Sequence, residues 1–571
     1  MNTSQENNID KKKCVGIDLG TTYSSISWFD TLNNRVDTID LNSADGAKVL
    51  RSVVFYPENG EPVVGEVAMN SAKENPDRVI IGIKRSMGTD YKTQPIDGKE
   101  YTPAEVSSHI LQVLVKDAQA YLGEEVGDVV ITVPAYFGDA ERAMTEEAGK
   151  LAGLNVRALL PEPHAAALAY SIDQVVDIID KYLLVYDLGG GTFDVTLIHV
   201  TTSNEADNSI NLKIETIFKE GNAHLGGLDW DRALAEIVKE KILEDTGEDI
   251  TNDFRNEVVL MDNCEKGKRQ LSRISPVKII GDLYGHQAEV TISDFEDRTN
   301  SLLLETQALL EVVLEEAEKK HGITKDKIDV LLTGGSTFED RTSSLLDETQ
   351  ALLEDVLDKA EKDFGITRDK IDVLLTGGST RMPMVPRMIE KVMGKPPVRH
   401  RNPELLVTIG AAYWAHILTS TDAIVVKVPN SSGDPSEKKV NIKESGLTDT
   451  ISYSVGIEIL RYDAQGQPMY VNDIILKKNS TAGEYFEKTY YLSENNMTEI
   501  QIVLYKGESS NPDECEKLCD FMIAGLPGGP TKGHEVRVRI GFNSLKGIIE
   551  GDAIYVPTGK KADISIARPV S

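Results

Sequence analysis

Two short stretches of this chain combine aspartates with glycines and hydroxyl side chains. The first is DLGGGTFD, residues 187–194. Consecutive glycines let a backbone approach a ligand closely, with its N–H groups turned towards phosphate oxygens. An aspartate at each end would repel a bare phosphate, so the pattern favours a hydrated divalent metal between the two carboxylates. An ordinary glycine-rich hairpin is the alternative for this stretch taken alone.

The second stretch, VGIDLGTTYSSIS at residues 15–27, repeats the same design. It places Asp18 at the end of one apolar run, then Leu-Gly and two threonines, then another run. The apolar runs that flank both turns predict antiparallel strands. Two such hairpins would let two lobes each clamp one side of a nucleotide's phosphates.

Lys84, Glu162 and His164 are further candidates for chemistry. Lys84 follows the apolar run 79–83, which would fix its backbone and leave the ammonium free to reach out. Glu162 stands between two prolines at a predicted helix start, which is a rigid place for a carboxylate. The alternatives are a solvated surface lysine and, for His164, packing in the first helical turn.

The elements that must position these side chains are helices predicted over 102–121 and 139–152 and a buried strand over 129–133. With 571 residues, 40% of them hydrophobic and 27% charged, the chain is predicted to be soluble and multidomain. The net charge of −31 disfavours nucleic acid and anionic membranes as partners.

Four scattered cysteines predict no disulfide framework, and Cys515 and Cys519 are interpreted as plain thiols rather than half of a metal site. The N-terminus is polar, and no stretch is long and apolar enough to span a bilayer. We therefore predict a cytoplasmic, reduced location.

The chain changes character after residue 418. Residues 419–449 include a polar stretch rich in Pro, Gly and Ser, which predicts an exposed linker. Short alternating strands over 450–571 then predict an all-β sandwich.

Nine motifs, in this order and spacing, resemble the ATPase domain of the DnaK-type 70-kDa heat-shock chaperones: VGIDLGTTYS, IGIKRSMG, VVITVPAYFGDAER, LLPEPHAAALAY, YDLGGGTFDVTLI, AHLGGLDWD, CEKGKRQLS, LLTGGSTRMPMV and NPELLVTIGAA. The resemblance covers residues 13–418 and implies an α/β, actin-like two-lobed ATPase domain. The sandwich resembles the β-half of the family's peptide-binding domain. The linker is longer than the family's, which puts coupling of the domains in doubt.

The resemblance also implies roles for individual residues. Lys84 would orient the attacking water, and Asp18, Glu162 and Asp187 would hold hydrated Mg²⁺. The remaining catalytic candidates are Thr192 and Asp194. Residues implied to bind ATP or ADP are Gly20, Thr21, Thr22, Tyr23, Gly189, Gly190, Gly191, Gly226, Gly227, Glu265, Lys268, Arg269, Ser272, Gly377, Gly378, Ser379, Arg381 and Glu404. K⁺ is an optional further ion, and Pro134 and Arg142 would relay the nucleotide state.

For the sandwich, the resemblance implies a channel for unfolded or extended polypeptides, lined or supported by Ile457, Ile459, Leu460, Tyr490, Ser493, Ile500 and Ile502. The alternative is that these residues simply fill the sandwich core. A J-domain co-chaperone and a nucleotide exchange factor are the implied partners. The family's helical lid is expected to be absent, because the last predicted strand ends close to Ser571.

One feature lies outside the family pattern. Residues 295–337 are repeated directly as residues 338–380, with 35 of 43 positions identical. Two copies are too few for a solenoid, so a local tandem duplication of one helix–strand unit is predicted. Only the second copy continues into the arginine motif, so it is expected to occupy the family's place. Leu304 and Val312 of the first copy, which are aspartates in the second, are expected to be buried, with exposure of an extruded unit as the alternative.

The sequence therefore predicts an ATP-driven chaperone whose nucleotide cycle regulates peptide binding. A nucleotide-gated binding or scaffold protein with little turnover is the alternative. A sugar kinase on the same fold is disfavoured, because it would need a sugar pocket between the lobes in place of a C-terminal sandwich.

Overall fold

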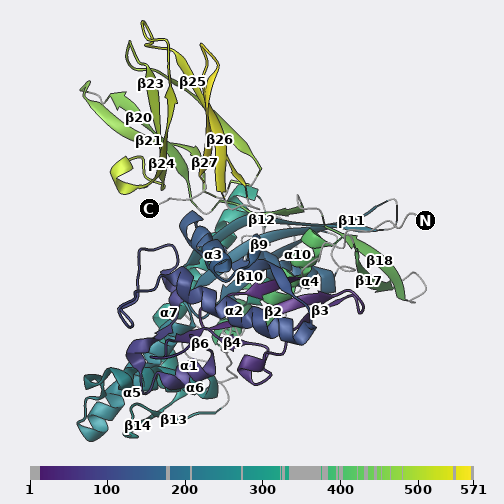
Figure 1. The fold of residues 1–571 in the computed structure, drawn as a ribbon, viewed down its shortest axis with the longest axis vertical. Coiled ribbons are helices and arrows are strands. Elements are labelled where there is room, and N and C mark those ends of the chain that lie inside the picture. The colour runs from purple at the N-terminus through teal and green to yellow at the C-terminus, as the bar shows by residue number, and fades with distance from the viewer. Residues whose placement is uncertain are drawn as a thin grey trace.

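The chain is described by a computed structural model that covers residues 13–174, 180–205, 207, 209–271, 274–321, 323, 328–333, 374–375, 384–393, 396–397, 403–420, 422–429, 435–442, 446–451, 453–462, 465–478, 480–481, 483–543 and 548–566. Strands and helices alternate up to residue 420, and the C-terminal part is all β (Figure 1). The predicted α/β domain followed by a β-sandwich is confirmed.

The first sheet has the strand order β3-β2-β1-β8-β9, with β4 paired to β2. Its strands are β1 (Lys13–Asp18), β2 (Tyr23–Asp30), β3 (Arg35–Thr38), β4 (Leu50–Arg51), β8 (Val126–Val133) and β9 (Asn155–Pro161). Strands β1, β8 and β9 are parallel to one another. Their carboxyl ends therefore meet at one edge of the sheet, and Asp18 and Glu162 stand there.

The second sheet has the order β16-β15-β10-β11-β12-β18-β17, with β19 paired to β12. Its strands are β10 (Asp180–Leu188), β11 (Phe193–Asn204), β12 (Ile210–Asn222), β15 (Ile328–Thr333), β16 (Leu374–Leu375), β17 (Ile424–Pro429), β18 (Pro435–Asn441) and β19 (Leu447–Thr448). The predicted hairpin is confirmed, since β10 and β11 are antiparallel and Asp187 lies opposite Asp194.

Helices cover both faces of each sheet. They are α1 (Glu66–Ser71), α2 (Pro103–Leu122), α3 (Asp139–Leu151), α4 (Glu162–Asp173), α5 (Gly227–Thr246), α6 (Phe254–Leu271), α7 (Ile292–His321), α9 (Met384–Met393) and α10 (Leu406–Thr419). Alternate residues of β10 enter different cores: Leu184 and Tyr186 face the core of α5–α7, whereas Leu183 and Val185 face α4 and α10. A strand with side chains on both faces has this period of two. Helices α4 and α10 thus lie between the two sheets.

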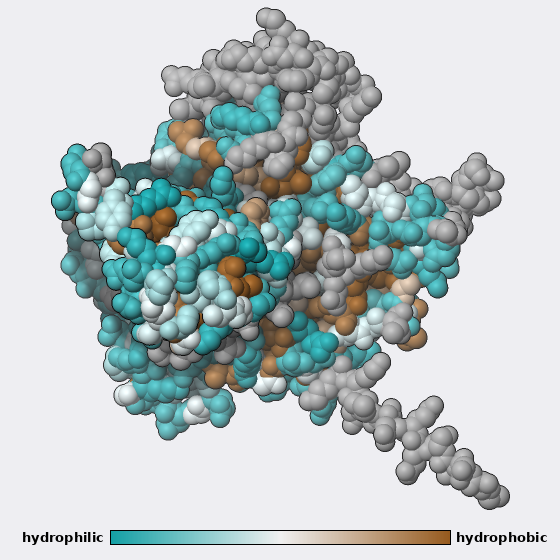
Figure 2. All heavy atoms as spheres, turned by 90° about the horizontal axis from the view of Figure 1, so that it is seen from above, coloured by the Kyte–Doolittle hydropathy of each residue, from teal (hydrophilic) through white to brown (hydrophobic). Residues whose placement is uncertain are grey.

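Two smaller sheets complete this part of the chain: β6-β5-β7, made of β5 (Val53–Phe55), β6 (Val63–Val64) and β7 (Val79–Ile81), and the hairpin of β13 (Val277–Ile280) with β14 (Gln287–Val290). Among the described residues, no helix is both long and apolar enough to cross a membrane. Seen from above, the surface is largely hydrophilic with scattered hydrophobic patches (Figure 2).

The C-terminal part is a sandwich of two four-stranded sheets, β21-β20-β23-β24 and β22-β25-β26-β27. The strands are β20 (Val455–Tyr462), β21 (Pro468–Leu476), β22 (Tyr485–Tyr491), β23 (Glu499–Lys506), β24 (Glu516–Ala524), β25 (Glu535–Asn543), β26 (Ile548–Tyr555) and β27 (Lys560–Ile566). All ladders between neighbouring strands are antiparallel. Aliphatic and aromatic residues of both sheets share one buried core.

The interval expected to be an exposed linker instead adds three strands to the second sheet (Figure 1). Strand β17 forms a hairpin with β18, and β18 pairs with β12 at Ile210 and Asn211. Strand β19 pairs in parallel with the same edge of β12, at Ile214 and Glu215. The valine-rich run of β17 before the polar stretch favours a strand, and its partner β18 completes the open edge of β12.

The duplicated unit is built into the second sheet. Strand β15 of the first copy pairs with β10, whereas the expectation that the second copy takes the family's place stays a prediction. The second copy's β16 pairs with β15 in parallel, with Leu331 opposite Leu374 and Leu332 opposite Leu375. Each of these residues lies opposite its own repeat equivalent. The predicted helix of the second copy lies outside the described residues, as do the Gly-Gly-Ser-Thr segments that end the two copies.

Burial along α7 corrects a second expectation. Val313 and Leu314 are 0% and 1% exposed, but Leu304 and Val312 are 46% and 43% exposed. The helix therefore packs on one side only, and Leu304 and Val312 lie on its open face. Two apolar residues in place of aspartates did not require a second layer, since single exposed apolar side chains are common on soluble proteins.

We expect the double substitution Leu304→Asp and Val312→Asp to leave the melting temperature nearly unchanged. Exposed positions usually change the free energy of unfolding by less than about 0.5 kcal/mol. The matched control is Val313→Asp on the same helix, which buries an unpaired carboxylate and should lower the melting temperature strongly. Thermal unfolding followed by circular dichroism measures both. A large loss in the double variant would show that this face is covered in solution.

Candidate functional site

The two glycine-containing turns face each other between the sheets. A Cβ at Gly190 would lie 2.0 Å from the Thr22 Oγ1, and one at Gly191 would lie 2.6 Å from the Thr21 Oγ1. Only a residue without a side chain allows this approach. The two stretches that the sequence singled out are therefore brought together, as predicted.

A third turn supports the second stretch. The backbone N–H of Gly227 donates to the Gly189 carbonyl at 2.9 Å, and that of Leu228 donates to the Gly190 carbonyl at 2.9 Å. The Arg85 Nε donates to the Gly191 carbonyl at 2.9 Å, and its guanidinium pairs with Asp229. Gly226 and Gly227 thus join the predicted loops, and Arg85 is a supporting residue that sequence reasoning missed.

Lys84 and Glu162 form a buried ion pair, with 2.7 Å between the Lys84 Nζ and the Glu162 Oε1. Both side chains are at most 10% exposed. Burial alone would lower the pKa of Lys84, but Glu162 and Asp18 outweigh it and raise this pKa above its usual value. Lys84 is therefore a charged group held by the acidic cluster rather than a solvated surface lysine.

Asp18 and Asp194 stand near the same pair. Burial, and then the charge of Glu162, raises the pKa of each aspartate to about 7. Asp187 lies opposite Asp194 in the hairpin, and its negative charge also raises the pKa of Lys84. Three buried carboxylates and the half-buried Asp18 thus gather near Lys84, and Lys219 also acts on Asp194. The excess of negative charge would be relieved by a bound cation.

Two donors fix the carboxylates of this acidic cluster. The Thr132 Oγ1 donates to the Asp18 Oδ1 at 3.0 Å, from the adjacent strand β8. The backbone N–H of Tyr136 donates to the Asp194 Oδ1 at 3.2 Å. The buried strand predicted over residues 129–133 was the sequence signal for Thr132 and Tyr136, because both lie at or just after its end, beside β1.

The donor set suits a hydrated Mg²⁺ ion. In the part of the chain that the structure describes, no three acidic, histidine or cysteine side chains come close enough together to ligate a metal directly. Mg²⁺ keeps much of its water and prefers carboxylate oxygens. Asp18, Glu162 and Asp187 are thus suited to holding the ion through its water shell. The two positive charges of Mg²⁺ would offset the negative charge of the acidic cluster.

Residues of α6 join the first loop to the opposite lobe. The Tyr23 hydroxyl donates to the Glu265 Oε1 at 2.8 Å, and the Arg269 guanidinium lies 5.0 Å from the centre of the Tyr23 ring. Burial would raise the pKa of Glu265, but Arg51 and Arg269 hold it below its usual value. The Lys268 Nζ pairs with Asp231 at 2.8 Å.

Several predicted nucleotide-binding residues lie outside the described residues: Ser272, Gly377, Gly378, Ser379 and Arg381. Glu404 is described, and it lies exposed in the short 3-10 helix Pro403–Leu405 before α10. The described contacts do not bring Glu404 to the two loops.

The predicted peptide-channel residues fall into two groups. Ile457, Ile500 and Ile502 are buried in the sandwich core, as the alternative interpretation held. Ile459, Leu460 and Tyr490 are half-buried, and Ser493 is exposed. The Tyr490 hydroxyl donates to Asp473 at 3.0 Å, which ties β22 to β21. Exposed Tyr470 lies opposite Leu460 in the β20–β21 ladder.

Comparisons with known proteins agree with this geometry. The family model described as Hsp70 protein matches residues 14–338 and 337–570. The two matches meet at the junction of the duplicated copies, as expected if the family contains one such unit. The chain is 34% identical over 565 residues to the chaperone protein DnaK of Thermotoga neapolitana, covering 97% of this chain and 80% of the relative.

The chaperone protein DnaK of Thermosipho africanus is 33% identical over 565 residues, covering 98% of this chain and 80% of the relative. The matches run through both the two-lobed part and the sandwich. With the glycine loops, the acidic cluster around Lys84 and the C-terminal sandwich in one chain, the protein belongs to the Hsp70 family.

Proposed function

We propose that ATP is hydrolysed between the two glycine loops, with Lys84 orienting the attacking water and the acidic cluster holding Mg²⁺. As a member of the Hsp70 family, the chain is an ATP-dependent chaperone and an ATPase. The observation that carries the proposed site is the buried Lys84–Glu162 pair among Asp18, Asp187 and Asp194. Phosphoryl transfer to water depends mostly on positioning and charge neutralisation, which such a cluster supplies.

The nucleotide would lie across both lobes. Thr21 and Thr22 would meet its phosphates from one side, and Gly189 to Gly191 from the other. Glu265, Lys268 and Arg269 on α6 would hold the adenosine, and their contacts with Tyr23 and Asp231 support this placement. When bound, Mg²⁺ would neutralise the phosphate charge.

The sandwich would bind extended segments of unfolded polypeptides through main-chain hydrogen bonds and a few apolar pockets. Of the predicted channel residues, half-buried Ile459 and Leu460 are available to contact such a segment, because they are apolar and not fully enclosed by the core. A J-domain co-chaperone and a nucleotide exchange factor are proposed partners on the strength of family membership alone.

A buried charge cluster at the junction supports coupling between the two parts. Asp449, which follows β19, lies 2.9 Å from the Lys219 Nζ and 3.7 Å from the Arg142 Nη2. Burial would raise the pKa of Asp449, but Lys219, His164 and Arg142 hold it below its usual value. A movement of Lys219 or Arg142 in the two-lobed part would therefore act directly on Asp449, just before the sandwich begins.

Side chains beyond the junction add to this contact. The Tyr453 hydroxyl donates to Asp139 on α3, and Lys478 pairs with Glu220 on β12 at 2.7 Å. The sandwich is thus fastened to the ATPase part at α3 and at β12. Arg142 on α3 belongs to this contact, which supports its predicted relay role.

Replacing Lys84 with Ala should nearly abolish hydrolysis while ATP binding is retained. Losing one positioned donor typically costs on the order of 3 kcal/mol of transition-state stabilisation. Single-turnover hydrolysis and a nucleotide titration measure the two effects separately. Lys150→Ala is the matched control, since Lys150 pairs with Glu146 at 2.6 Å on the surface. Unchanged hydrolysis in the Lys84 variant would remove its role, and a wild type that binds ATP without turnover would favour the scaffold alternative.

Replacing Asp449 with Asn should bring the peptide release rates in ATP and ADP towards each other. The reason is that Lys219 and Arg142 lose the charge that links them to the junction. Breaking one half of a buried pair also destabilises a protein by about 3–5 kcal/mol.

The double variant Lys219→Met, Asp449→Asn separates these effects in stopped-flow release of a labelled peptide. It should regain stability without regaining the difference between nucleotides. A double variant with the full wild-type difference would show that the pair does not transmit the nucleotide state.

A further inference from the structure

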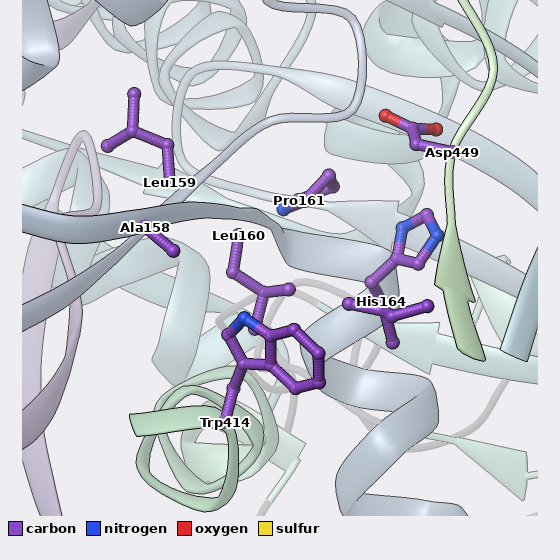
Figure 3. A pocket seen from close by; sticks show the side chains of 8 residues that line it. Ala158, Leu159, Leu160, Pro161, His164, Trp414 and Asp449 are labelled. Carbon is purple, nitrogen blue, oxygen red and sulfur yellow. The ribbon is translucent and has the colours of Figure 1, made fainter. Parts of the chain in front are cut away.

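A small pocket lies beside the junction, away from the glycine loops. Its lining includes Leu160, His164, Trp414 and Asp449, and its cavity measures about 20 Å³, too small for a nucleotide. Figure 3 shows the imidazole of His164 and the carboxylate of Asp449 on one side of it, with Trp414 near Leu160. His164 belongs to α4, whereas Asp449 belongs to the junction. The pocket therefore marks the place where these two segments meet.

The hydrogen bonds of His164 point to a specific role. Its Nε2 lies 3.0 Å from the Thr448 carbonyl oxygen and 3.1 Å from the Thr216 Oγ1. A carbonyl oxygen can only accept, so the Nε2 carries the hydrogen and donates it to the junction. His164 is 1% exposed, so this donor has no access to bulk water. If the Thr448 carbonyl moved away, the His164 Nε2 would keep only the Thr216 hydroxyl of these two partners.

His164 stands in the same helical turn as Glu162. Helix α4 begins at Glu162, and prolines 161 and 163 flank that residue. Proline fixes its φ angle, which limits how far this turn can rearrange without moving as a unit. One end of the turn thus holds the Lys84 ammonium at 2.7 Å, and the other holds the junction backbone at 3.0 Å.

Strand β19 needs such an anchor because it is short. It pairs with β12 through Leu447 and Thr448 alone. The next residue, Asp449, is held by Lys219 on β12 and Arg142 on α3. Lys219, Arg142 and His164 all hold the junction. Of these three residues, only His164 shares a rigid turn with a residue of the proposed hydrolytic site, Glu162.

We propose that His164 is a positioning residue that transmits the position of the junction strand β19 to the Glu162 carboxylate. With β19 paired to β12, the Thr448 carbonyl fixes the imidazole, and the first turn of α4 presents Glu162 to Lys84. When β19 moves away, the turn loses this restraint and the geometry at Lys84 relaxes. The inference rests on the proposed hydrolysis at Lys84 and Glu162, and it adds the residue through which the sandwich acts on that site.

The test compares His164→Gln, which keeps a side-chain N–H donor, with His164→Phe, which fills the space without one. The hydrolysis rate per bound ATP, in a single turnover with Mg²⁺, should fall about tenfold in the Phe variant, the lower end of the loss typical for a partner one step removed from the reacting groups. The Gln variant should recover part of that rate. Hydrogen exchange of the Thr448 to Thr450 amides should be faster in the Phe variant only.

Thr216→Val is the matched control, because it removes the other partner of the same nitrogen but leaves the junction bond. It should keep the wild-type rate. Normalising to bound ATP removes any difference in folded fraction. Equal rates for Phe, Gln and wild type would overturn the proposal, as would faster amide exchange in the Phe variant with an unchanged rate. Absence of hydrolysis in wild type and Thr216→Val alike would instead overturn the proposed function.

Discussion

The gathering of four carboxylates, three of them buried, near Lys84 is the constraint on which the rest of the structure depends. Asp18, Glu162 and the hairpin pair Asp187 and Asp194 come from three chain segments, and burial with the charge of Glu162 raises the pKa of Asp18 and Asp194. Such a cluster can persist only where rigid elements hold each residue in place. Three parallel strands ending at one sheet edge, a glycine hairpin facing it and the proline-flanked start of α4 meet this requirement.

The same packing makes the site and the junction parts of one connected region. Helices α4 and α10 fill the space between the sheets, and the turn that begins α4 borders the proposed hydrolytic site on one side and the junction on the other. Strand β12 forms part of the second sheet and also receives β18 and β19 at its edge. Glu162, which contacts Lys84, and His164, which contacts the junction backbone, stand only two residues apart in the chain.

The sequence predicted the parts of this arrangement that follow from local pattern. Alternating apolar residues around two glycine turns sufficed for β1–β2 and β10–β11, and the flanking prolines sufficed for the position of Glu162. It could not predict the contacts of Arg85 with Gly191 and of Thr132 with Asp18, because each partner lies far away in the chain. The β17–β18 hairpin was missed because a polar turn dominates its composition, whereas the open edge of β12 decides its structure. Burial of Leu304 and Val312 was predicted because the second copy has aspartates at these positions, but both side chains lie on the exposed face of α7.

The register of β15 and β16 bears on what would happen if one copy of the duplication were lost. Because Leu331 lies opposite Leu374 and Leu332 opposite Leu375, the two paired strands are copies of each other. Excision of one 43-residue repeat length that begins anywhere within the first copy, residues 295–337, would join two equivalent positions. The shortened chain would still place an identical IDVLLT segment beside β10. The two copies are thus interchangeable, and recombination between them would change the edge of the sheet while keeping a strand next to the β10–β11 hairpin.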